Sequence, residues 1–340
     1  MHGPDNIPHV RGNKNYFYCA HPFDSYDNIM CIDPANVLVY LLSAGFGTRL
    51  RPYTRDFQKV ALGIFALPPV VCHIHNLRRQ GFRRFLLNLH HAPQSVKEVV
   101  RRLAPPDVHI AYIHEPDILG SGGALFNARD RLSSLFLLLN GDTYFSIDGL
   151  SLIRFHRAEG TMISLVVAPR YNRPFTGLQV TGRRVSAIAE NKETAYPYMF
   201  TGVHCLYRDI VTVITPGFSN IVTDVYLPLV AAGEIAAYVS TQPFADIGSP
   251  RALMAGLAWL LKRQFRAWGL RDMCGYDAEA NSLYVPPGPA GGHVSDSTLS
   301  YDVTLGTDAQ VQGSLIMQHN HLPAGTRISR AIVGPYTYFP

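Results

Sequence analysis

The stretch "LLSAGFGTRLRPYT", residues 41–54, is the part of this sequence that indicates the fold most clearly. Its apolar residues run directly into the glycine pair Gly45 and Gly47, and Thr48 and Arg49 follow at once. A Gly-x-Gly between a strand and a helix is typical of loops whose backbone N–H groups bind phosphate. We therefore expect a strand before the glycine pair, then an anion-binding loop, with the Arg49 guanidinium offering a fork of donors to phosphate oxygens.

Three kinds of phosphate-binding loop compete for this stretch. The dinucleotide fingerprint needs a third glycine where the chain has Leu50, and a P-loop needs a Gly-Lys-Ser/Thr ending that the stretch lacks. The remaining interpretation is a loop that wraps the triphosphate of a nucleotide substrate. Lys59, ten residues beyond Arg49, would add a point charge to that loop.

Outward from the glycine pair, short apolar runs alternate with amphipathic stretches over residues 37–170. Apolar runs such as "VLVYLL" and "LFLLLN" are typical of strands that are covered on both faces. The alternation predicts a doubly wound α/β domain with a mostly parallel sheet. A later helix is expected to begin at Ser249 and Pro250, which offer favourable capping chemistry.

The composition of the chain divides it into four segments. Residues 1–36 are polar and aperiodic and form an N-terminal extension, 37–270 hold the α/β domain, and 271–292 are a linker rich in Gly and Pro. Residues 293–340 repeat aliphatic side chains among Gly, Asp and Thr at roughly hexapeptide spacing. Such repeats are typical of the coils of a parallel β-helix, and only a few coils fit here.

Charge and cysteine content narrow the function classes. The formal net charge is +5, and the arginines are spaced as on the outer faces of helices, so we expect no nucleic-acid partner. Five cysteines without a CxxC pair argue against zinc and against a disulfide framework, and favour the reducing cytoplasm. No apolar run is long enough to cross a bilayer, so we expect no membrane association.

The string "LSAGFGTRLRPYT" with a downstream Lys resembles the signature of the sugar-1-phosphate nucleotidyltransferases, the nucleotide-sugar pyrophosphorylases, and in particular their mannose-1-phosphate guanylyltransferase-like members. Four further segments resemble the family in the right order: "EPDILGSGGAL" (115–125), "LLLNGDTYF" (137–145), "FTGVHCLYRDI" (200–210) and "FADIGSPRAL" (244–253). The resemblance covers about residues 37–262. It implies a Rossmann-like, GT-A-like nucleotidyltransferase domain with a mixed sheet, a short C-terminal left-handed parallel β-helix, and a homo-oligomer.

The resemblance also implies a reaction, in which a sugar or cyclitol 1-phosphate attacks the α-phosphorus of a nucleoside triphosphate and pyrophosphate leaves. Arg49, Lys59 and Asp142 would be the catalytic residues, and Asp142 and Asp246 would hold Mg²⁺. Ordinary structural roles stay open: a turn residue for Asp142, a helix cap for Asp246, and surface ion pairs for Arg49 and Lys59. By the same resemblance, the nucleotide would contact Leu42, Ala44, Gly45, Gly47, Thr48, Gly120, Ser121, Gly122 and Gly141, and the sugar phosphate Gly177, Glu190, Lys192 and Thr201.

The chain departs from the family pattern at several positions. Gln58 stands where Pro usually precedes the Lys, Gly63 replaces another Pro, and Phe244 replaces a Trp. Asn191 interrupts the usual Glu-Lys pair and leaves the register of Lys192 open. These changes leave an unusual sugar or cyclitol phosphate open as the acceptor.

Base identity and catalytic competence complete the expectations. The segment "LGSGGAL" is more similar to guanylyltransferases, and to some uridylyl- and cytidylyltransferases, than to thymidylyltransferases; among these bases GTP is favoured. A non-catalytic nucleotide-sugar sensor or partner subunit is an alternative, but it would not need the metal carboxylates. A metal-dependent glycosyltransferase is a second alternative, but Asn140-Gly141-Asp142 offers one carboxylate where that class has Asp-x-Asp.

Overall fold

The computed structural model describes residues 32–170, 175–189, 195–242, 244–261, 274–286, 288 and 291–339. Residues 33–340 form one compact unit. Most of the expected N-terminal extension, residues 1–36, lies outside the described residues. Its last residues form the single turn η2 (Pro34–Asn36), where the Asp33 carboxylate accepts a hydrogen bond from the Ala35 N–H.

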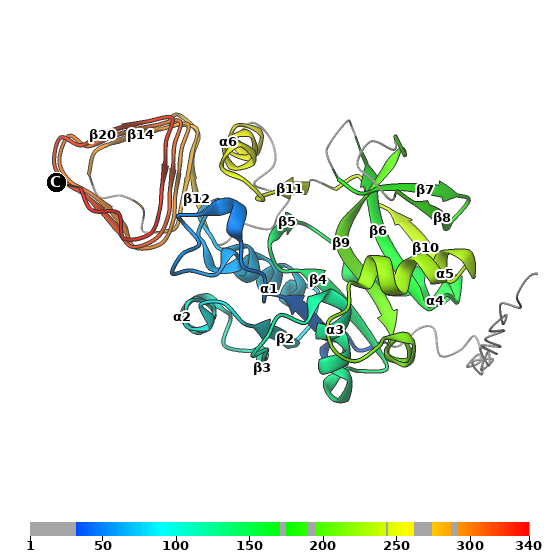
Figure 1. The fold of residues 1–340 in the computed structure, drawn as a ribbon. Coiled ribbons are helices and arrows are strands. Elements are labelled where there is room, and N and C mark those ends of the chain that lie inside the picture. The colour runs from blue at the N-terminus through cyan, green and yellow to red at the C-terminus, as the bar shows by residue number, and fades with distance from the viewer. Residues whose placement is uncertain are drawn as a thin grey trace, which may run out of the picture. The chain divides into compact units, whose positions relative to one another are not determined.

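A mixed sheet organises the α/β part (Figure 1). In the described residues it has nine strands in the order β3-β2-β1-β4-β9-β6-β10-β8-β7. Strands β1 to β4 pair with one another in parallel, whereas β9 runs antiparallel to β4 and to β6. The predicted α/β domain with a mixed sheet is confirmed. The strands are β1 (Leu38–Leu42), β2 (Arg84–Leu89), β3 (His109–His114), β4 (Leu135–Asn140), β6 (Ile163–Pro169), β7 (Gly177–Thr181), β8 (Arg184–Ile188), β9 (Tyr198–Tyr207) and β10 (Ile235–Val239).

The helices follow the strands in the order that the alternating pattern predicts. Helix α6 begins after Ser249, whose hydroxyl accepts a bond from the Ala252 N–H, so the predicted cap is confirmed. The helices are α1 (Pro69–Arg79), α2 (Pro93–Leu103), α3 (Gly120–Asn127), α4 (Gly149–Glu159), α5 (Leu227–Ala231) and α6 (Pro250–Trp259), with the short turns η4 (Lys59–Ala61), η5 (Arg129–Arg131), η6 (Arg208–Val213) and η7 (Ile221–Tyr226). No described helix is long and apolar enough to cross a membrane.

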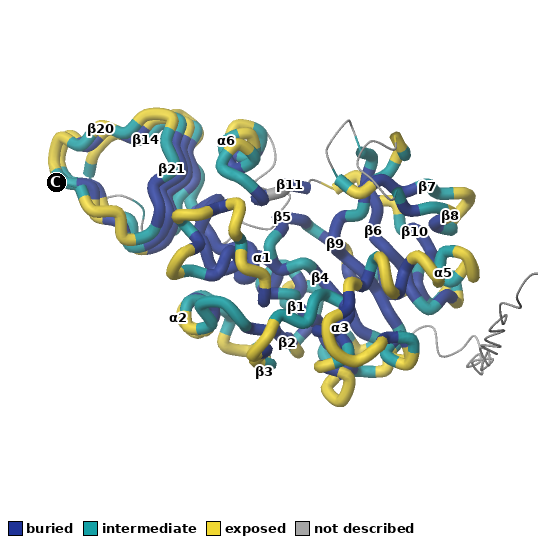
Figure 2. Tube along the Cα trace, viewed as in Figure 1, coloured by how far each residue is buried: buried dark blue, intermediate teal, exposed yellow. Residues whose placement is uncertain are grey.

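Both faces of the central strands are buried, as Figure 2 shows. On one face of β1, Leu38 and Tyr40 pack in a cluster with Leu125 of α3. Val39 and Leu41, which point to the other face, are also fully buried. The unbroken apolar runs therefore reflect strands that have no solvent-facing side.

The segment after the glycine pair differs from the expected strand-loop-helix unit. Gly47 is followed directly by the 3₁₀ turn η3 (Thr48–Leu50), and the first α-helix begins only at Pro69. Arg51 has an extended backbone with ψ near 139°, as residues before proline prefer, and Pro52 cannot donate a helical hydrogen bond. The loop therefore continues to Lys59 instead of entering a helix.

Short parallel strands form the C-terminal part, which Figure 1 shows as stacked triangular coils. Strands β13, β15, β18 and β21 pair in parallel, as do β14, β17 and β20, and also β16 and β19. Equivalent residues such as Ser297 and Ser314 are 17 positions apart. The strands are β12 (Gly275–Asp277), β13 (Ser282–Tyr284), β14 (His293–Ser295), β15 (Thr298–Leu299), β16 (Val303–Leu305), β17 (Gln310–Gln312), β18 (Leu315–Ile316), β19 (Asn320–Leu322), β20 (Arg327–Ser329) and β21 (Ile332–Val333).

The segment expected to be a linker, residues 271–292, carries structure in its described part. It contains β12 and β13, and β13 pairs with β15 of the coils. Leu283 of β13 is fully buried in a cluster with Leu257 and Leu315. These buried apolar contacts make the described part of this segment belong to the coils and not to a linker.

Direct hydrogen bonds join the coils to the loop beyond Lys59. The Gln318 side-chain oxygen accepts from the Gly63 N–H at 2.8 Å, and the Ser300 hydroxyl donates to the Ala66 carbonyl at 2.6 Å. A side chain at Gly63 would place its Cβ 1.8 Å from the Ser300 hydroxyl oxygen. This contact explains why the chain has Gly63 where the family usually has Pro.

Candidate active site

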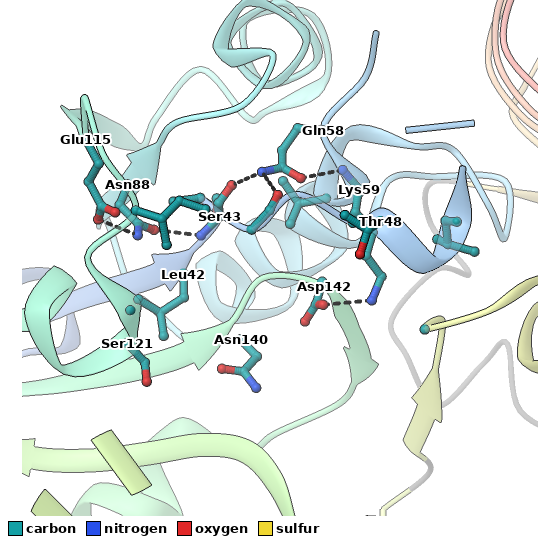
Figure 3. A pocket seen from close by; sticks show the side chains of 18 of the residues that line it. Leu42, Ser43, Thr48, Gln58, Lys59, Asn88, Glu115, Ser121, Asn140 and Asp142 are labelled. Atoms are coloured by element: carbon teal, nitrogen blue, oxygen red, sulfur yellow. Dashed lines mark hydrogen bonds and ion pairs between the residues drawn. The ribbon is translucent and has the colours of Figure 1, made fainter. Parts of the chain in front are cut away.

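A cavity of about 370 Å³ lies where β1, β2 and β4 end. This is the edge at which ligands bind in open α/β sheets, at the point where the strand order reverses. Figure 3 shows side chains from separate parts of the sequence around this space. The cavity brings together Leu42, Ala44, Gly45, Gly47, Thr48, Arg49, Lys59, Gly120, Ser121 and Asp142 of the expected site residues.

The loop between β1 and η3 presents free backbone donors. In the described residues, the N–H groups of residues 44–47 donate to no protein acceptor. Gly47 has a φ of 61°, which favours glycine, and its carbonyl accepts from the Thr54 hydroxyl at 2.9 Å. A Cβ on Gly45 would meet no atom within 4 Å, so this glycine borders open space. Such a row of unpaired N–H groups is suited to an anion.

Two basic residues and one carboxylate stand beside this loop. The Lys59 ammonium bonds the Asp142 carboxylate at 2.7 Å, and their side chains are 8% and 40% exposed. Arg49 is exposed and forms no ion pair with any described residue. The cavity therefore holds one buried cation that is paired and one exposed cation that is available.

The backbone brings the second expected metal ligand close to Asp142. Asp142 directly precedes β5 (Thr143–Phe145), and Asp246 ends β11 (Phe244–Asp246). These strands pair antiparallel with Asp246 opposite Thr143, so the two aspartates stand at the same end of the ribbon. The Asp246 side chain lies outside the described residues.

The expected Mg²⁺ site at this end of the ribbon stays a prediction. No group of three or more Asp, Glu, His or Cys side chains gathers for a metal in the described part of the chain. Mg²⁺ is commonly bound by one or two carboxylates, with substrate phosphates and water completing the coordination. Asp142 and Asp246 would supply these carboxylates.

Buried polar side chains that the sequence motifs did not predict also border the cavity. The Ser43 N–H donates to Asn88 Oδ1 at 2.6 Å, and Asn88 Nδ2 donates to Glu115 Oε1 at 2.8 Å. The Leu119 N–H approaches Glu115 Oε2 at 3.4 Å. Asn88 and Glu115 are almost completely buried. The polar Asn88 inside the apolar run "RFLLNL" is the sequence feature that could have indicated these hydrogen bonds.

Two of the expected nucleotide contacts, Gly122 and Gly141, lie against other segments of the chain. A Cβ on Gly122 would lie 2.5 Å from the Ser219 hydroxyl, and one on Gly141 would lie 2.8 Å from the Leu42 carbonyl. Neither residue lines the cavity. Both positions require a glycine because another segment of the chain approaches closely, and their contact with the nucleotide stays a prediction.

The residues expected on the sugar side do not line the cavity either. Gly177 lies in β7 opposite Met199, and the buried Thr201 of β9 donates its hydroxyl to the Val166 carbonyl at 2.8 Å. Glu190 and Lys192 lie outside the described residues. The described structure thus leaves the sugar-phosphate assignment a prediction.

A buried histidine supports the turn that carries Asp142. His73 of α1 is fully buried near the backbone of Asn140 and Thr143, and burial lowers its pKa to about 4, against the opposing effect of those backbone contacts. It is therefore neutral at physiological pH.

Comparison with known proteins is consistent with this geometry. Residues 38–263 match the family described as nucleotidyl transferase. A mannose-1-phosphate guanylyltransferase of Mycobacterium tuberculosis is 24% identical over 297 residues, which are 85% of this chain and 82% of that protein. Mannose-1-phosphate guanylyltransferase 1 of Arabidopsis thaliana is 27% identical over 64% of this chain and 63% of its own length.

Solved structures share the fold. HddC from Yersinia pseudotuberculosis, complexed with GMP-PN, superposes with a TM-score of 0.57 at 24% identity, over 64% of this chain and 97% of that chain. A putative glucose-1-phosphate thymidylyltransferase from Bacillus anthracis gives a TM-score of 0.59 at 17% identity, over 72% and 98%. Because the family match spans most of the sheet and the whole cavity, the chain belongs to the nucleotidyl transferase family.

Proposed function

We propose that the protein transfers a nucleoside monophosphate from GTP to a sugar-type 1-phosphate, giving a nucleotide sugar and pyrophosphate. The observation that supports this most strongly is the meeting of the unpaired N–H groups of residues 44–47 with Arg49, Lys59 and Asp142 at one cavity. Both substrates are anions, so a site for their reaction must neutralise charge and align the attack.

The proposed step forms one bond and breaks another. An oxygen of the sugar phosphate forms a bond to the α-phosphorus, and the bond from that phosphorus to the bridging oxygen of the pyrophosphate breaks. The loop N–H groups and Arg49 would hold the β- and γ-phosphates, and Lys59 would stabilise charge on the transferred phosphoryl group. Mg²⁺, when bound to Asp142 and Asp246, would neutralise charge on the phosphates.

Glu115 supports guanine as the base. Guanine presents two adjacent donor groups, N1–H and the N2 amine, on its pairing edge, whereas uracil and thymine present one donor between two acceptors. The Glu115 carboxylate borders the cavity and can accept more bonds than the two it receives. A buried carboxylate therefore suits guanine and disfavours a carbonyl-rich edge.

The remaining assignments extend this proposal. We retain Gly177, Glu190, Lys192 and Thr201 as the sugar-phosphate side, and the cytoplasm as the compartment, since the described cysteines are buried free thiols. The coils are proposed to be a left-handed parallel β-helix. Their repeat of 17 residues, close to three hexapeptides, supports this handedness.

A matrix of the common nucleoside triphosphates against sugar and cyclitol 1-phosphates, read by pyrophosphate release and product mass, tests the proposal. GTP should be used best, and Glu115→Gln should reduce the preference for GTP over UTP by about tenfold or more. Asp117→Asn, the same chemical change at an exposed neighbour, should leave it unaltered. Tight nucleotide-sugar binding without turnover in any combination would favour a non-catalytic sensor instead.

A further inference from the structure

Gln58 is a fully satisfied polar side chain at the centre of the cavity wall. It is 1% exposed, and its Nε2 donates to the Ser43 carbonyl at 2.5 Å and to the Gly45 carbonyl at 2.6 Å. Its Oε1 accepts from the Lys59 N–H at 2.5 Å. Its own N–H donates to the Ser95 hydroxyl at 2.9 Å. One side chain thus joins the glycine-rich loop to the backbone of Lys59, as Figure 3 shows.

These two carbonyls determine the direction of two of the free loop N–H groups. A trans peptide is planar, so its N–H points opposite to its C=O. The Ser43 carbonyl shares a peptide with the Ala44 N–H, and the Gly45 carbonyl shares one with the Phe46 N–H. Because both carbonyls point at Gln58, both N–H groups point away from it and stay without a protein acceptor.

Neither glutamate nor proline can reproduce this arrangement. An amide nitrogen has two hydrogens for the two carbonyls, and the amide oxygen is free to accept from Lys59. Glu would set a carboxylate against two carbonyl oxygens, and Pro would remove the side-chain donors and the backbone N–H that bonds Ser95. Buried carbonyls left without donors would turn towards other partners.

We propose that Gln58 is a positioning residue that orients the Ala44 and Phe46 N–H groups and Lys59 towards one triphosphate. The inference rests on the proposed function for its substrate, but the binding it describes is independent of turnover. In this proposal the Gln58 side chain stiffens the loop, as a proline would at the same position. Inorganic tripolyphosphate is the suitable probe, because it carries the phosphates without the base or the reaction.

The test compares Gln58→Met and Gln58→Glu with the wild type by calorimetry, using tripolyphosphate and GTP, and by steady-state kinetics with mannose 1-phosphate. We expect both variants to weaken tripolyphosphate and GTP binding by about tenfold or more. The KM for GTP should rise by a similar factor, while the KM for mannose 1-phosphate changes less than about twofold.

Gln80→Met is the matched control. Gln80 also donates from Nε2 to a backbone carbonyl, that of Ile147 at 2.7 Å, and accepts from the Gly149 N–H at 2.7 Å, but it does not line the cavity. Its loss should lower the melting temperature without changing either KM. An equal change in both KM values for Gln58→Met and Gln80→Met would show a merely structural role for Gln58.

The outcomes separate the two proposals. Wild-type protein that binds tripolyphosphate but transfers nothing would overturn the proposed function and leave the role of Gln58 supported if its variants bind more weakly. Unchanged tripolyphosphate binding in folded Gln58 variants would overturn the positioning role, and so would the failure of both Gln58→Met and Gln58→Glu to fold at all. No binding by the wild type would overturn both.

Discussion

Replacing Lys59 by methionine removes one charge from the cavity while keeping most of the side-chain volume. The ammonium lies 2.7 Å from Asp142, and at an effective dielectric constant of about 20 the Coulomb attraction is about 6 kcal/mol. Dehydration of the buried Lys59 offsets most of this. Asp142 stays hydrated at 40% exposure, so the free energy of unfolding should change by no more than about 1 kcal/mol.

The effect of Lys59→Met on catalysis should be much larger than its effect on stability. Loss of one preorganised group that stabilises developing charge typically costs about 10²–10³ in kcat, or about 2.7–4 kcal/mol. Because the ammonium is held beside the loop rather than in solvent, water cannot reproduce its position. We therefore expect kcat to fall by at least about 10²-fold.

The assay combines initial rates of pyrophosphate release at saturating substrates with urea unfolding. Lys97→Met, the same substitution at an exposed residue of α2, is the control and should leave both unaltered. A kcat within about threefold of wild type, or a loss of rate matched by a loss of folded protein, would refute a direct role for Lys59.

Three further predictions follow from the same geometry. Asp142→Asn and Asp246→Asn should each lower kcat by at least about 10²-fold with the fold retained by circular dichroism, and near-normal turnover would make that residue structural. Arg49→Ala should weaken GTP binding far more than sugar-phosphate binding in separate calorimetric titrations, and Arg49→Lys should not fully restore it; the reverse pattern would assign the loop to the other substrate. Burial lowers the pKa of His73 to about 4 and of His156 and His204 to about 3, so the unfolded chain binds more protons below pH 6.5. The free energy of unfolding should therefore fall as pH drops from 6.5 towards 4, by up to about 1.4 kcal/mol per pH unit per histidine, and urea midpoints that do not decrease between pH 7 and 5 would contradict this.

Local sequence patterns predicted most of the fold. The run "VLVYLL" predicted a doubly covered strand, and β1 is buried on both faces. Ser249 and Pro250 predicted the start of α6 because capping depends on neighbouring residues alone. The Gly45 and Gly47 pair likewise located the loop, and the positive φ of Gly47 explains the glycine at that position.

Contacts between distant segments could not be predicted in this way. Gly122 is a glycine because Ser219 approaches it closely. No residue near Gly122 in the sequence indicates that contact. The same is true of the hydrogen bond from the Ser43 N–H to Asn88, which spans 45 positions. In the sequence, Gln58 could be recognised only as a departure from the family motif. Its role depends on the Ser43 and Gly45 carbonyls, which lie beside it only in the folded protein.

The measurement that tests the central claim most directly follows GTP labelled in its α-phosphate through one incubation with Mg²⁺ and the purified chain. Transfer predicts that the label appears in a nucleotide sugar, that unlabelled pyrophosphate forms in equal amount, and that neither appears when the sugar 1-phosphate is omitted. Label released as GMP, or pyrophosphate formed at the same rate without the second substrate, would contradict transfer at this cavity.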